Sequence, residues 1–328
     1  MRRFLGGALP AQAAIAVIAN DALGNFVVST PLLQMLRAEY PQAKLHYFSG
    51  TRAQELWRSS PLIDKGYVLY GADPRQAAAM IPDHFDLVIN LELSCWAKCF
   101  AALCCTSSTH IVGPCLSSSG RDDLPFQEDE RGRLWKDTEW ISQDLTSRYP
   151  FLESGFIGEL FCRLAYLDGP VPGYAVPQEE PPFDTPQILI ATAASLPEKL
   201  WPVEKWLALL AALPSKPGLI GAKPQEQKKF WQGGSGEEEL VASVSIEDLR
   251  GKLTLPQVVG ALARARQVIT LDNGILHLAV STGTPVVGLY RHGIHRLWAP
   301  PYENLTVVTP GKGSPVSDIE PQQVLNVL

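Results

Sequence analysis

Residues 271–290 bring together more side chains that could do chemistry than any other part of the chain. Asp272, Asn273 and Gly274 follow a short β-branched run, and His277 stands three residues further on. Asp and Asn are favoured helix N-caps, so the pattern predicts a strand, an acidic turn and then a helix. Free N–H groups at a helix N-terminus favour phosphate, and parallel sheets bind ligands at the carboxyl ends of their strands. These residues therefore predict a nucleotide or nucleotide-sugar site.

A second set of candidate residues follows an expected strand at 187–191. Thr192 and Ser195 lie on the loop after it, and Lys199 precedes a Trp-Pro pair that is typical of a helix start. A lysine could stabilise the negative charge that grows on a phosphate leaving group. The two hydroxyls could donate hydrogen bonds to the same phosphates. The alternative for Lys199 is a solvated loop lysine.

The residues of the acidic turn also have structural alternatives. Asp272 could be only the N-cap of the helix, and His277 could be a half-buried histidine satisfied by backbone. A carboxylate that faces a diphosphate is repelled by it. A binding role for Asp272 would therefore be a hydrogen bond to a donor hydroxyl or to the backbone of a neighbouring loop.

The elements that position these residues alternate along the chain. In the first half we expect strands at 14–19, 44–48, 66–70, 85–91 and 110–112, and helices at 26–40, 52–58, 95–105 and 135–148. In the second half we expect strands at 187–191, 218–221, 240–244, 267–271 and 286–289, and helices at 203–213, 225–232, 255–265 and 275–282. Such alternation favours right-handed crossovers and parallel sheets.

Residues 168–186 contain six prolines and are typical of an extended linker between two compact units. We therefore expect an α/β chain of two doubly wound, Rossmann-like domains, 1–167 and 187–328, that face a central cleft. Apolar residues make up 46% and charged residues 19% of the 328 residues, which is enough for two cores.

Charge and hydropathy exclude some classes of function. The net charge of −6 does not offer the concentrated positive charge that nucleic-acid binding needs. No apolar run reaches the length of a membrane span. The apolar N-terminal segment superficially resembles a secretory signal, but Gly6, Gly7 and Pro10 interrupt it, so we expect a cytoplasmic protein. Six cysteines between 95 and 162 lack paired C-x-x-C spacing and favour buried thiols over a metal site or disulfides.

Three segments in order resemble glycosyltransferase family nine, the heptosyltransferases. Residues 24–33 (GNFVVSTPLL) resemble the family's Gly-Asp turn, its apolar run and Thr-Pro. Residues 199–206 (KLWPVEKW) resemble its Lys-x-Trp-Pro-x-x-x-Trp segment, and residues 272–277 (DNGILH) its Asp-x-Gly-x-x-His. The resemblance is thin between about residues 50 and 187.

The resemblance implies the two-domain GT-B fold. The N-terminal domain would bind the acceptor and the C-terminal domain the nucleotide sugar, and a return of the last helix to the N-terminal domain is left open. It also implies inverting transfer without a metal ion or other cofactor. Glu226 matches the family's ribose-contacting carboxylate, and a surface helix charge is its alternative.

The chain departs from the family pattern at Asn25, where the family has an aspartate thought to act as general base. An amide cannot take a proton at neutral pH, although it can orient an acceptor hydroxyl. Asp21 is a carboxylate four residues earlier, on the same turn. We therefore expect Asp21 to be the substitute base, with a purely structural turn role as the alternative.

The sequence thus predicts transfer of a sugar such as heptose, from an ADP-activated donor, onto a saccharide or lipid-linked saccharide acceptor such as a lipopolysaccharide core. Peripheral contact with the cytoplasmic face of the inner membrane is left open. One rival is a catalytically impaired nucleotide-sugar or glycan-binding protein, which Asn25 favours. The other is a dinucleotide oxidoreductase, which is disfavoured because no G-x-G-x-x-G follows an expected strand.

Overall fold

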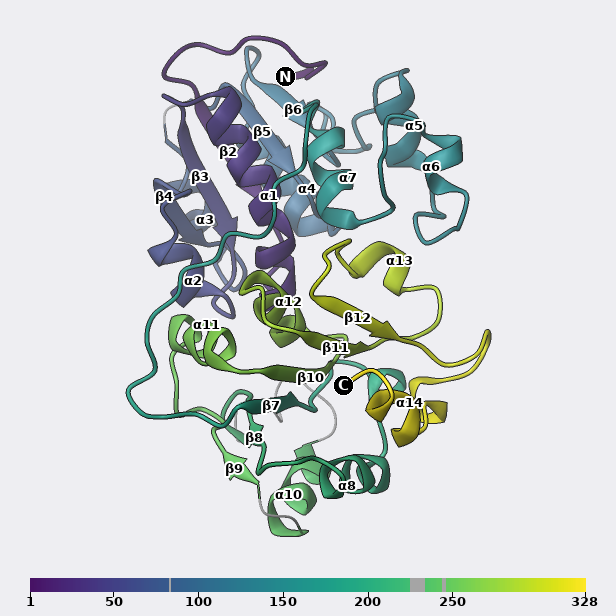
Figure 1. The fold of residues 1–328 in the computed structure, drawn as a ribbon. Helices are drawn as coiled ribbons and strands as arrows, with labels where there is room; N and C mark the ends of the chain where they lie inside the picture. The colour runs from purple at the N-terminus through teal and green to yellow at the C-terminus, as the bar shows by residue number, and fades with distance from the viewer. Residues whose placement is uncertain (83, 225–233, 244–245) are drawn as a thin grey trace. The chain divides into compact units, whose positions relative to one another are not determined.

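The computed structural model describes residues 1–82, 84–224, 234–243 and 246–328. The chain divides into two compact units, Met1–Ala175 and Val176–Leu328. Each unit holds one six-stranded sheet in which every strand pair is parallel. Two parallel sheets with helical crossovers are the two Rossmann-like domains of a GT-B fold (Figure 1). No helix among the described residues is long and apolar enough to cross a membrane.

The first unit has the strand order β1-β6-β5-β2-β3-β4. Its strands are β1 (Arg2–Arg3), β2 (Ala14–Ile18), β3 (Lys44–Ser49), β4 (Lys65–Val68), β5 (Leu87–Asn90) and β6 (His110–Val112). Its helices are α1 (Leu23–Glu39), α2 (Gln54–Ser59), α3 (Pro74–Ala79), α4 (Cys95–Leu103), α5 (Glu130–Lys136), α6 (Leu145–Arg148) and α7 (Ile157–Leu164).

Helices cover both faces of the first sheet. Side chains alternate between the faces along a strand, so Tyr47 and Phe48 of β3 point in opposite directions. Tyr47 meets Phe26 of α1, with ring centroids 5.8 Å apart, whereas Phe48 meets Phe100 of α4 at 5.0 Å. The two layers bury the central strands β2, β3 and β5 on both faces, as their apolar sequences predict.

The second unit has the strand order β12-β11-β10-β7-β8-β9. Its strands are β7 (Ile188–Ala191), β8 (Gly218–Leu219), β9 (Glu247–Asp248), β10 (Gln267–Leu271), β11 (Val286–Leu289) and β12 (Leu305–Val308). Its helices are α8 (Val203–Ala211), α10 (Gly234–Ser243), α11 (Leu255–Arg264), α12 (Gly274–Ser281), α13 (His295–Trp298) and α14 (Pro321–Leu325), with short 3-10 turns η1 (Pro197–Lys199) and η2 (Val316–Asp318). Helices α11 and α12 lie on one face of this sheet, and α8, α10 and α14 lie on the other (Figure 1).

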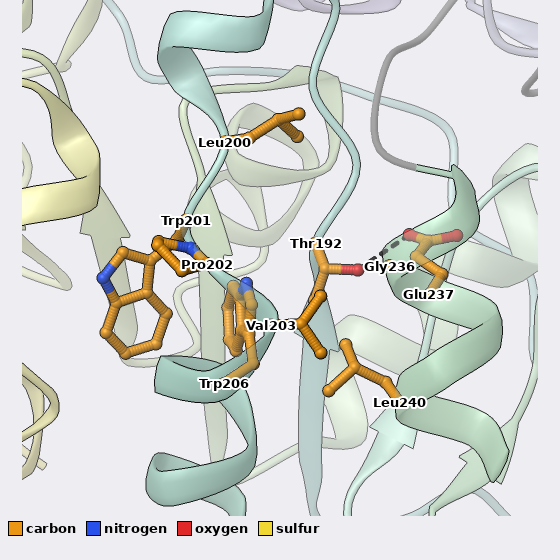
Figure 2. Close-up of a pocket in the computed structure, with 9 residues that line it drawn as sticks. All are labelled: Thr192, Leu200, Trp201, Pro202, Val203, Trp206, Gly236, Glu237 and Leu240. Carbon is orange, nitrogen blue, oxygen red and sulfur yellow. Dashed lines mark hydrogen bonds between the residues drawn. The ribbon is translucent and has the colours of Figure 1, made fainter. Parts of the chain in front are cut away.

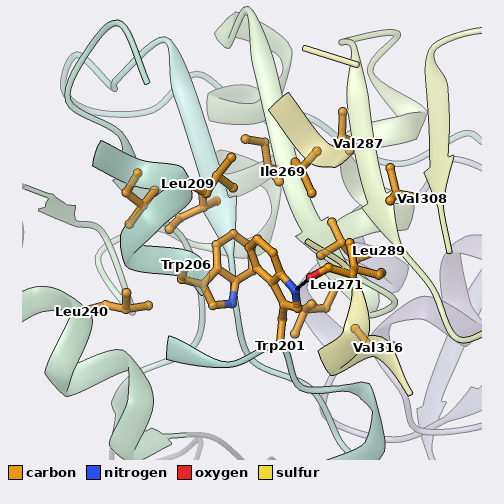
Figure 3. Packing of buried hydrophobic residues seen from close by; sticks show 14 of the residues in the cluster. Trp201, Trp206, Leu209, Leu240, Ile269, Leu271, Val287, Leu289, Val308 and Val316 are labelled. Carbon is orange, nitrogen blue, oxygen red and sulfur yellow. Dashed lines mark hydrogen bonds between the residues drawn. The ribbon is translucent and has the colours of Figure 1, made fainter. Parts of the chain in front are cut away.

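The core of the second unit is built around two tryptophans from the segment that resembles the family. Trp201 and Trp206 are buried, with ring centroids 4.9 Å apart in an edge-to-face arrangement. They pack against apolar side chains of β10, β11 and β12 (Figure 3). The Trp201 indole N–H also donates to the Ile319 carbonyl at 2.8 Å. This packing fixes the start of α8, and with it the loop that carries Lys199.

The C-terminal helix α14 packs against α8 of its own unit. The Lys205 ammonium of α8 reinforces this docking, because it lies 2.8 Å from the Glu320 carboxylate and 2.7 Å from the Ser317 carbonyl. These contacts make α14 part of the second unit.

Two expected elements are wrong. Of the strand expected at 240–244, residues 240–243 lie in helix α10 and residue 244 lies outside the described residues. Glu237, Leu240 and Val241 are three and four residues apart, so they share the buried side of this helix. The expected helix at 135–148 is broken between α5 and α6. There the side chains of Asp137 and Asp144 accept hydrogen bonds within the loop at 2.8 and 2.7 Å, which competes with helix formation.

Candidate functional site

The second sheet has a topological switch point between β7 and β10, since the strand order runs outward in opposite directions from this pair. Ala191 of β7 and Thr270 of β10 are paired in register. The amide of Asn273 joins the loops after both strands by donating to the Ala193 carbonyl at 2.9 Å. The loops that carry Lys199 and Asp272 therefore leave the sheet side by side.

Lys199 and Asp272 form an ion pair at this position. The Lys199 Nζ lies 2.7 Å from the Asp272 Oδ2 and 3.3 Å from the Asp272 carbonyl oxygen. The Asp272 side chain is 6% exposed and that of Lys199 17% exposed, so the carboxylate is buried and the ammonium retains access to solvent. The solvated loop lysine that was the alternative for Lys199 is therefore not what the structure shows.

Asn273, not Asp272, is the N-cap of helix α12. Its Oδ1 accepts from the Leu276 backbone N–H at 3.1 Å, and Gly274 is the first helical residue. The capping alternative for Asp272 is wrong for a simple reason: Asn273 occupies the cap, which leaves the Asp272 carboxylate to Lys199. The unused backbone N–H groups of the α12 N-terminus lie beside that ion pair.

His277 is buried rather than half-buried, with 2% of its surface exposed. Burial lowers the pKa of His277 to about 4, with the Lys199 charge acting in the same direction and the Asp272 charge opposing it. The ring lies edge-on to Trp298 of α13, with centroids 6.4 Å apart. At neutral pH this imidazole is uncharged and donates from one nitrogen only.

The other predicted donor residues lie less directly at the site. The Thr192 hydroxyl donates its single proton to the Glu237 carboxylate at 2.7 Å, so it can meet a ligand only as an acceptor. Ser195 is exposed on the loop before η1. Glu226 lies outside the described residues.

A pocket of about 280 Å³ lies between α8 and α10, beside the end of β7 (Figure 2). Its lining includes Thr192, Leu200, Trp201, Trp206, Glu237 and Leu240. The two polar groups at its wall, Thr192 and Glu237, are bonded to each other. The Trp206 indole N–H is buried without an acceptor among the described residues, and the apolar side chains of Leu200, Trp206 and Leu240 form much of the wall.

The structure adds Arg291, which sequence reasoning missed, to this site. Arg291 follows the carboxyl end of β11, and its guanidinium lies 3.2 Å from the Glu198 carboxylate, next to Lys199 in the chain. Tyr290 precedes it and is completely buried; burial and the Asp272 charge raise the pKa of its hydroxyl. The usable signal in the sequence was the position directly after a strand, RHGIHR at 291–296.

The predicted acceptor residues lie in the first unit, at the turn between β2 and α1. The Asp21 Oδ1 accepts from the Arg52 backbone N–H at 3.1 Å. Its carboxylate packs so closely on Gly50 that a Cβ there would lie 1.8 Å from the same oxygen. Asn25 is half-buried in the first turn of α1. Asp21 therefore joins the loop after β2 to the loop after β3.

Within the described part of the chain, no group of three or more His, Cys, Asp or Glu side chains is placed to hold a metal ion.

Comparison with known proteins places this geometry in a family. Residues 169–323 match the profile of Glycosyltransferase family 9 (heptosyltransferase). A search of curated protein sequences gives no significant match.

Among solved structures, a family 9 glycosyl transferase from Veillonella parvula aligns with a TM-score of 0.75 at 17% identity, covering 98% of this chain and 97% of that one. ADP-heptose lps heptosyltransferase II of E. coli aligns at 0.67 and 19% identity, covering 95% and 96%. E. coli heptosyltransferase WaaC with ADP aligns at 0.61 and 17% identity, covering 95% and 98%. At these identities the likeness shows a shared fold over both units. Residues 169–323 therefore match family 9, the heptosyltransferases, and the whole chain shares its two-domain fold with solved members of that family.

Proposed function

We propose that this glycosyltransferase moves a heptose-like sugar from an ADP-activated donor onto a saccharide acceptor such as a lipopolysaccharide core, with inversion and without a metal ion. The observation that carries the proposal is the Lys199–Asp272 pair at the switch point of the second sheet, beside the N-terminus of α12. Transfer from a nucleotide sugar expels a diphosphate, and fixed positive groups at that position stabilise the leaving charge.

The donor site would use its groups in distinct ways. Lys199, still paired with Asp272, would direct its remaining N–H donors at the departing diphosphate, and the backbone N–H groups at Gly274 would add donors. Asp272 would hold Lys199 in place and His277 would donate one hydrogen bond as a neutral imidazole. The pocket between α8 and α10 supports this arrangement, since the apolar side chains of Leu200, Trp206 and Leu240 suit a nucleoside base.

The acceptor would bind to the first unit. Asn25 would orient its hydroxyl through the side-chain amide, and a carboxylate near the end of β2 would take the proton; Asp21 is the one that the sequence predicts. The acceptor would be a saccharide or lipid-linked saccharide, reached at the cytoplasmic face of the inner membrane by a protein that contacts it peripherally.

Donor chemistry can be tested with the purified chain. ADP-, UDP- and GDP-sugars are incubated with candidate acceptors, and nucleoside-diphosphate release is measured with and without a chelator. We expect release from an ADP-sugar that the chelator does not reduce. Loss of turnover on chelation would contradict the metal-independent mechanism.

Lys199→Ala should weaken ADP binding by about tenfold to more than a hundredfold, the worth of a charge-assisted contact of roughly 1.5–3 kcal/mol. Calorimetry with ADP measures this, with the exposed Lys216 changed to Ala as the matched control. Equal affinity in the wild type and Lys199→Ala would remove Lys199 from the site.

The alternative is a catalytically impaired nucleotide-sugar or glycan-binding protein, which the amide at Asn25 favours. That protein would bind ADP yet release none from a nucleotide sugar with any acceptor. Asn25→Asp would then be the variant most apt to gain activity.

A further inference from the structure

The first sheet has its own topological switch point, between β2 and β5, and two polar side chains meet there. Ile18 of β2 and Asn90 of β5 are paired in register, so the chain leaves both strands at the same level. Asn20 and Glu92 follow at that edge, and the Asn20 Nδ2 donates to the Glu92 Oε2 at 3.0 Å. This is the edge at which doubly wound sheets bind ligands.

The backbone of Glu92 is fixed by a buried asparagine. Asn90 is completely buried; its Oδ1 accepts from the Glu92 N–H at 3.0 Å, and its Nδ2 donates to the carbonyls of Glu92 at 2.9 Å and Pro114 at 2.7 Å. An amide that makes these three bonds cannot rotate without leaving buried groups unpaired. The backbone from which the Glu92 side chain extends is therefore rigid.

Asn20 is equally constrained. Its Oδ1 accepts from the Ala22 N–H at 2.9 Å, and its carbonyl accepts from the Ser49 hydroxyl at 2.6 Å. The bonds run from β5 through Glu92 and Asn20 to the end of β3. They hold the Glu92 carboxylate at the strand ends without any partner of positive charge among the described residues.

One oxygen of this carboxylate is unused. The Glu92 Oε1 has no hydrogen-bond partner among the described residues. Burial raises the pKa of Glu92, while the hydrogen bond from Asn20 opposes that shift. A base whose pKa lies nearer the working pH takes a proton more effectively.

Tyr70 brings a second unused group to the same place. Its hydroxyl is buried and lacks a hydrogen-bond partner among the described residues. Burial raises the pKa of Tyr70, and the charges of Glu92 and Asp21 nearby raise it further. The phenol therefore remains protonated near the Glu92 carboxylate.

Asp21 offers less than Glu92. One of its oxygens is held by the Arg52 N–H, and its carboxylate is wedged against Gly50 in the loop after β3. It follows one strand of the switch point and leans toward β3. Glu92 follows the other strand, is bonded across the switch point, and keeps one oxygen open.

We propose that Glu92 is the proton acceptor for the acceptor hydroxyl. The role rests on the proposed function. The acceptor oxygen forms a bond to the anomeric carbon while its proton passes to the Glu92 Oε1. The bond from that carbon to the diphosphate breaks, and the diphosphate leaves with the electron pair. Glu92 then returns its proton to solvent.

Glu92→Gln tests this role, because glutamine keeps an oxygen for the Asn20 hydrogen bond but cannot take a proton at neutral pH. With ADP-heptose as donor and heptose-deficient lipopolysaccharide as acceptor, we expect turnover to fall by about 10²- to 10⁴-fold. ADP affinity and melting temperature should stay at the wild-type values. Glu92→Asp should retain intermediate activity, and Glu39→Gln, at an exposed carboxylate of the same unit, should match the wild type.

The pH profile separates a base from a structural carboxylate. The wild-type kcat/KM should decline as Glu92 becomes protonated on acidification, and this decline should be absent in the residual activity of Glu92→Gln. The other titratable groups facing this site, Asp21, Tyr47 and Tyr70, are unchanged in that variant.

Two results would overturn the assignment. Wild-type turnover in Glu92→Gln, together with a large loss in Asp21→Asn, would make Asp21 the base and leave the proposed function intact. A wild type that binds ADP but transfers no heptose to any acceptor would overturn the proposed function and this role of Glu92 with it.

Discussion

At the scale of single residues, the proposed donor site contains two opposite charges that restrain each other. Asp272 is buried, and its carboxylate is tolerated because the Lys199 ammonium lies 2.7 Å away. The ion pair also restricts the rotamers of Lys199. Less side-chain conformational entropy is therefore lost when Lys199 binds a phosphate. His277 completes the group as an uncharged donor, because burial holds its pKa at about 4.

His277 should make the stability of the second unit depend on pH. Its pKa is about 6.5 in the unfolded chain and about 4 when folded, so the unfolded state binds the extra proton between these values. The contribution of the neutral ring is complete above pH 6.5 and is lost as the pH falls toward 4, to the extent of roughly 3 kcal/mol. Melting temperatures measured from pH 7.5 to 4.5 should therefore fall less in His277→Gln than in the wild type.

His292 supplies the control for this measurement, since His292→Gln removes an exposed histidine of the same unit. Its melting curve should follow the wild type at every pH. Parallel acid losses in the wild type and His277→Gln would show that the ring is not held neutral by burial.

At the scale of elements, a buried ion pair fastens α10 to the edge of the second sheet. The Arg250 guanidinium, just after β9, lies 3.2 Å from the Glu237 carboxylate of α10 and 2.8 Å from that of Asp248. The side chains of Arg250 and Glu237 are 2% and 1% exposed. Thr192 donates to the other Glu237 oxygen, so the pair also shapes the pocket beside β7.

Arg250→Met should destabilise the chain by about 3–5 kcal/mol, because it leaves the Glu237 charge buried without its cation. Urea unfolding followed by tryptophan fluorescence measures the change. The double variant Arg250→Met, Glu237→Gln should recover part of the loss, and Arg264→Met, at an exposed pair, should cost less than about 1 kcal/mol. A double variant less stable than Arg250→Met alone would contradict this account.

The sequence predicts those elements whose strand, helix-cap and turn residues all lie within a short segment. The β10–α12–β11 unit was predicted because β-branched strands, an Asn cap and Gly283 stand in sequence order. The sequence predicts a strand over part of helix α10 because Leu240 and Val241 fit a strand as well as a helix. The burial of Glu237, one turn before Leu240, is visible only in the structure.

A residue of the candidate site could be predicted only where its neighbours in the sequence identify it. Asp272 could be predicted because it directly follows β10, and Lys199 because it precedes the Trp-Pro helix start in the loop after β7. Their ion pair needs the strand order to bring β7 beside β10. Glu92 and Arg291 were missed for the same reason. Their neighbours, Asn20 and Glu198, are far away in the sequence and meet them only through the topology of the sheets.

At the scale of the whole molecule, the chain between the units is anchored at both of its ends. The Gly173 carbonyl and the Ala175 N–H bond to Gln34 and Thr30 of α1, at 2.6 and 3.1 Å. On the other side, the Glu179 N–H donates to the Pro256 carbonyl of α11 at 3.0 Å. The division between the units falls between these anchors, after Ala175. Residues 176–178, between these anchors, could change their backbone angles without breaking either anchor. Hinges between domains usually consist of a few such residues.

A hinge at that place should let the units approach when the donor binds. The proposed proton acceptor, Glu92, belongs to the first unit, and the proposed diphosphate-binding residue, Lys199, belongs to the second. Transfer therefore requires both residues to approach the same sugar. Closure of the units would also exclude water. Small-angle scattering of the full chain should therefore give a smaller radius of gyration at saturating ADP-heptose than without ligand. Lys199→Ala, measured at the same ligand concentration, should show less compaction because fewer molecules are occupied. Superimposable profiles with and without saturating donor would mean that the units do not move on binding, and that the acceptor alone must bring the two edges together.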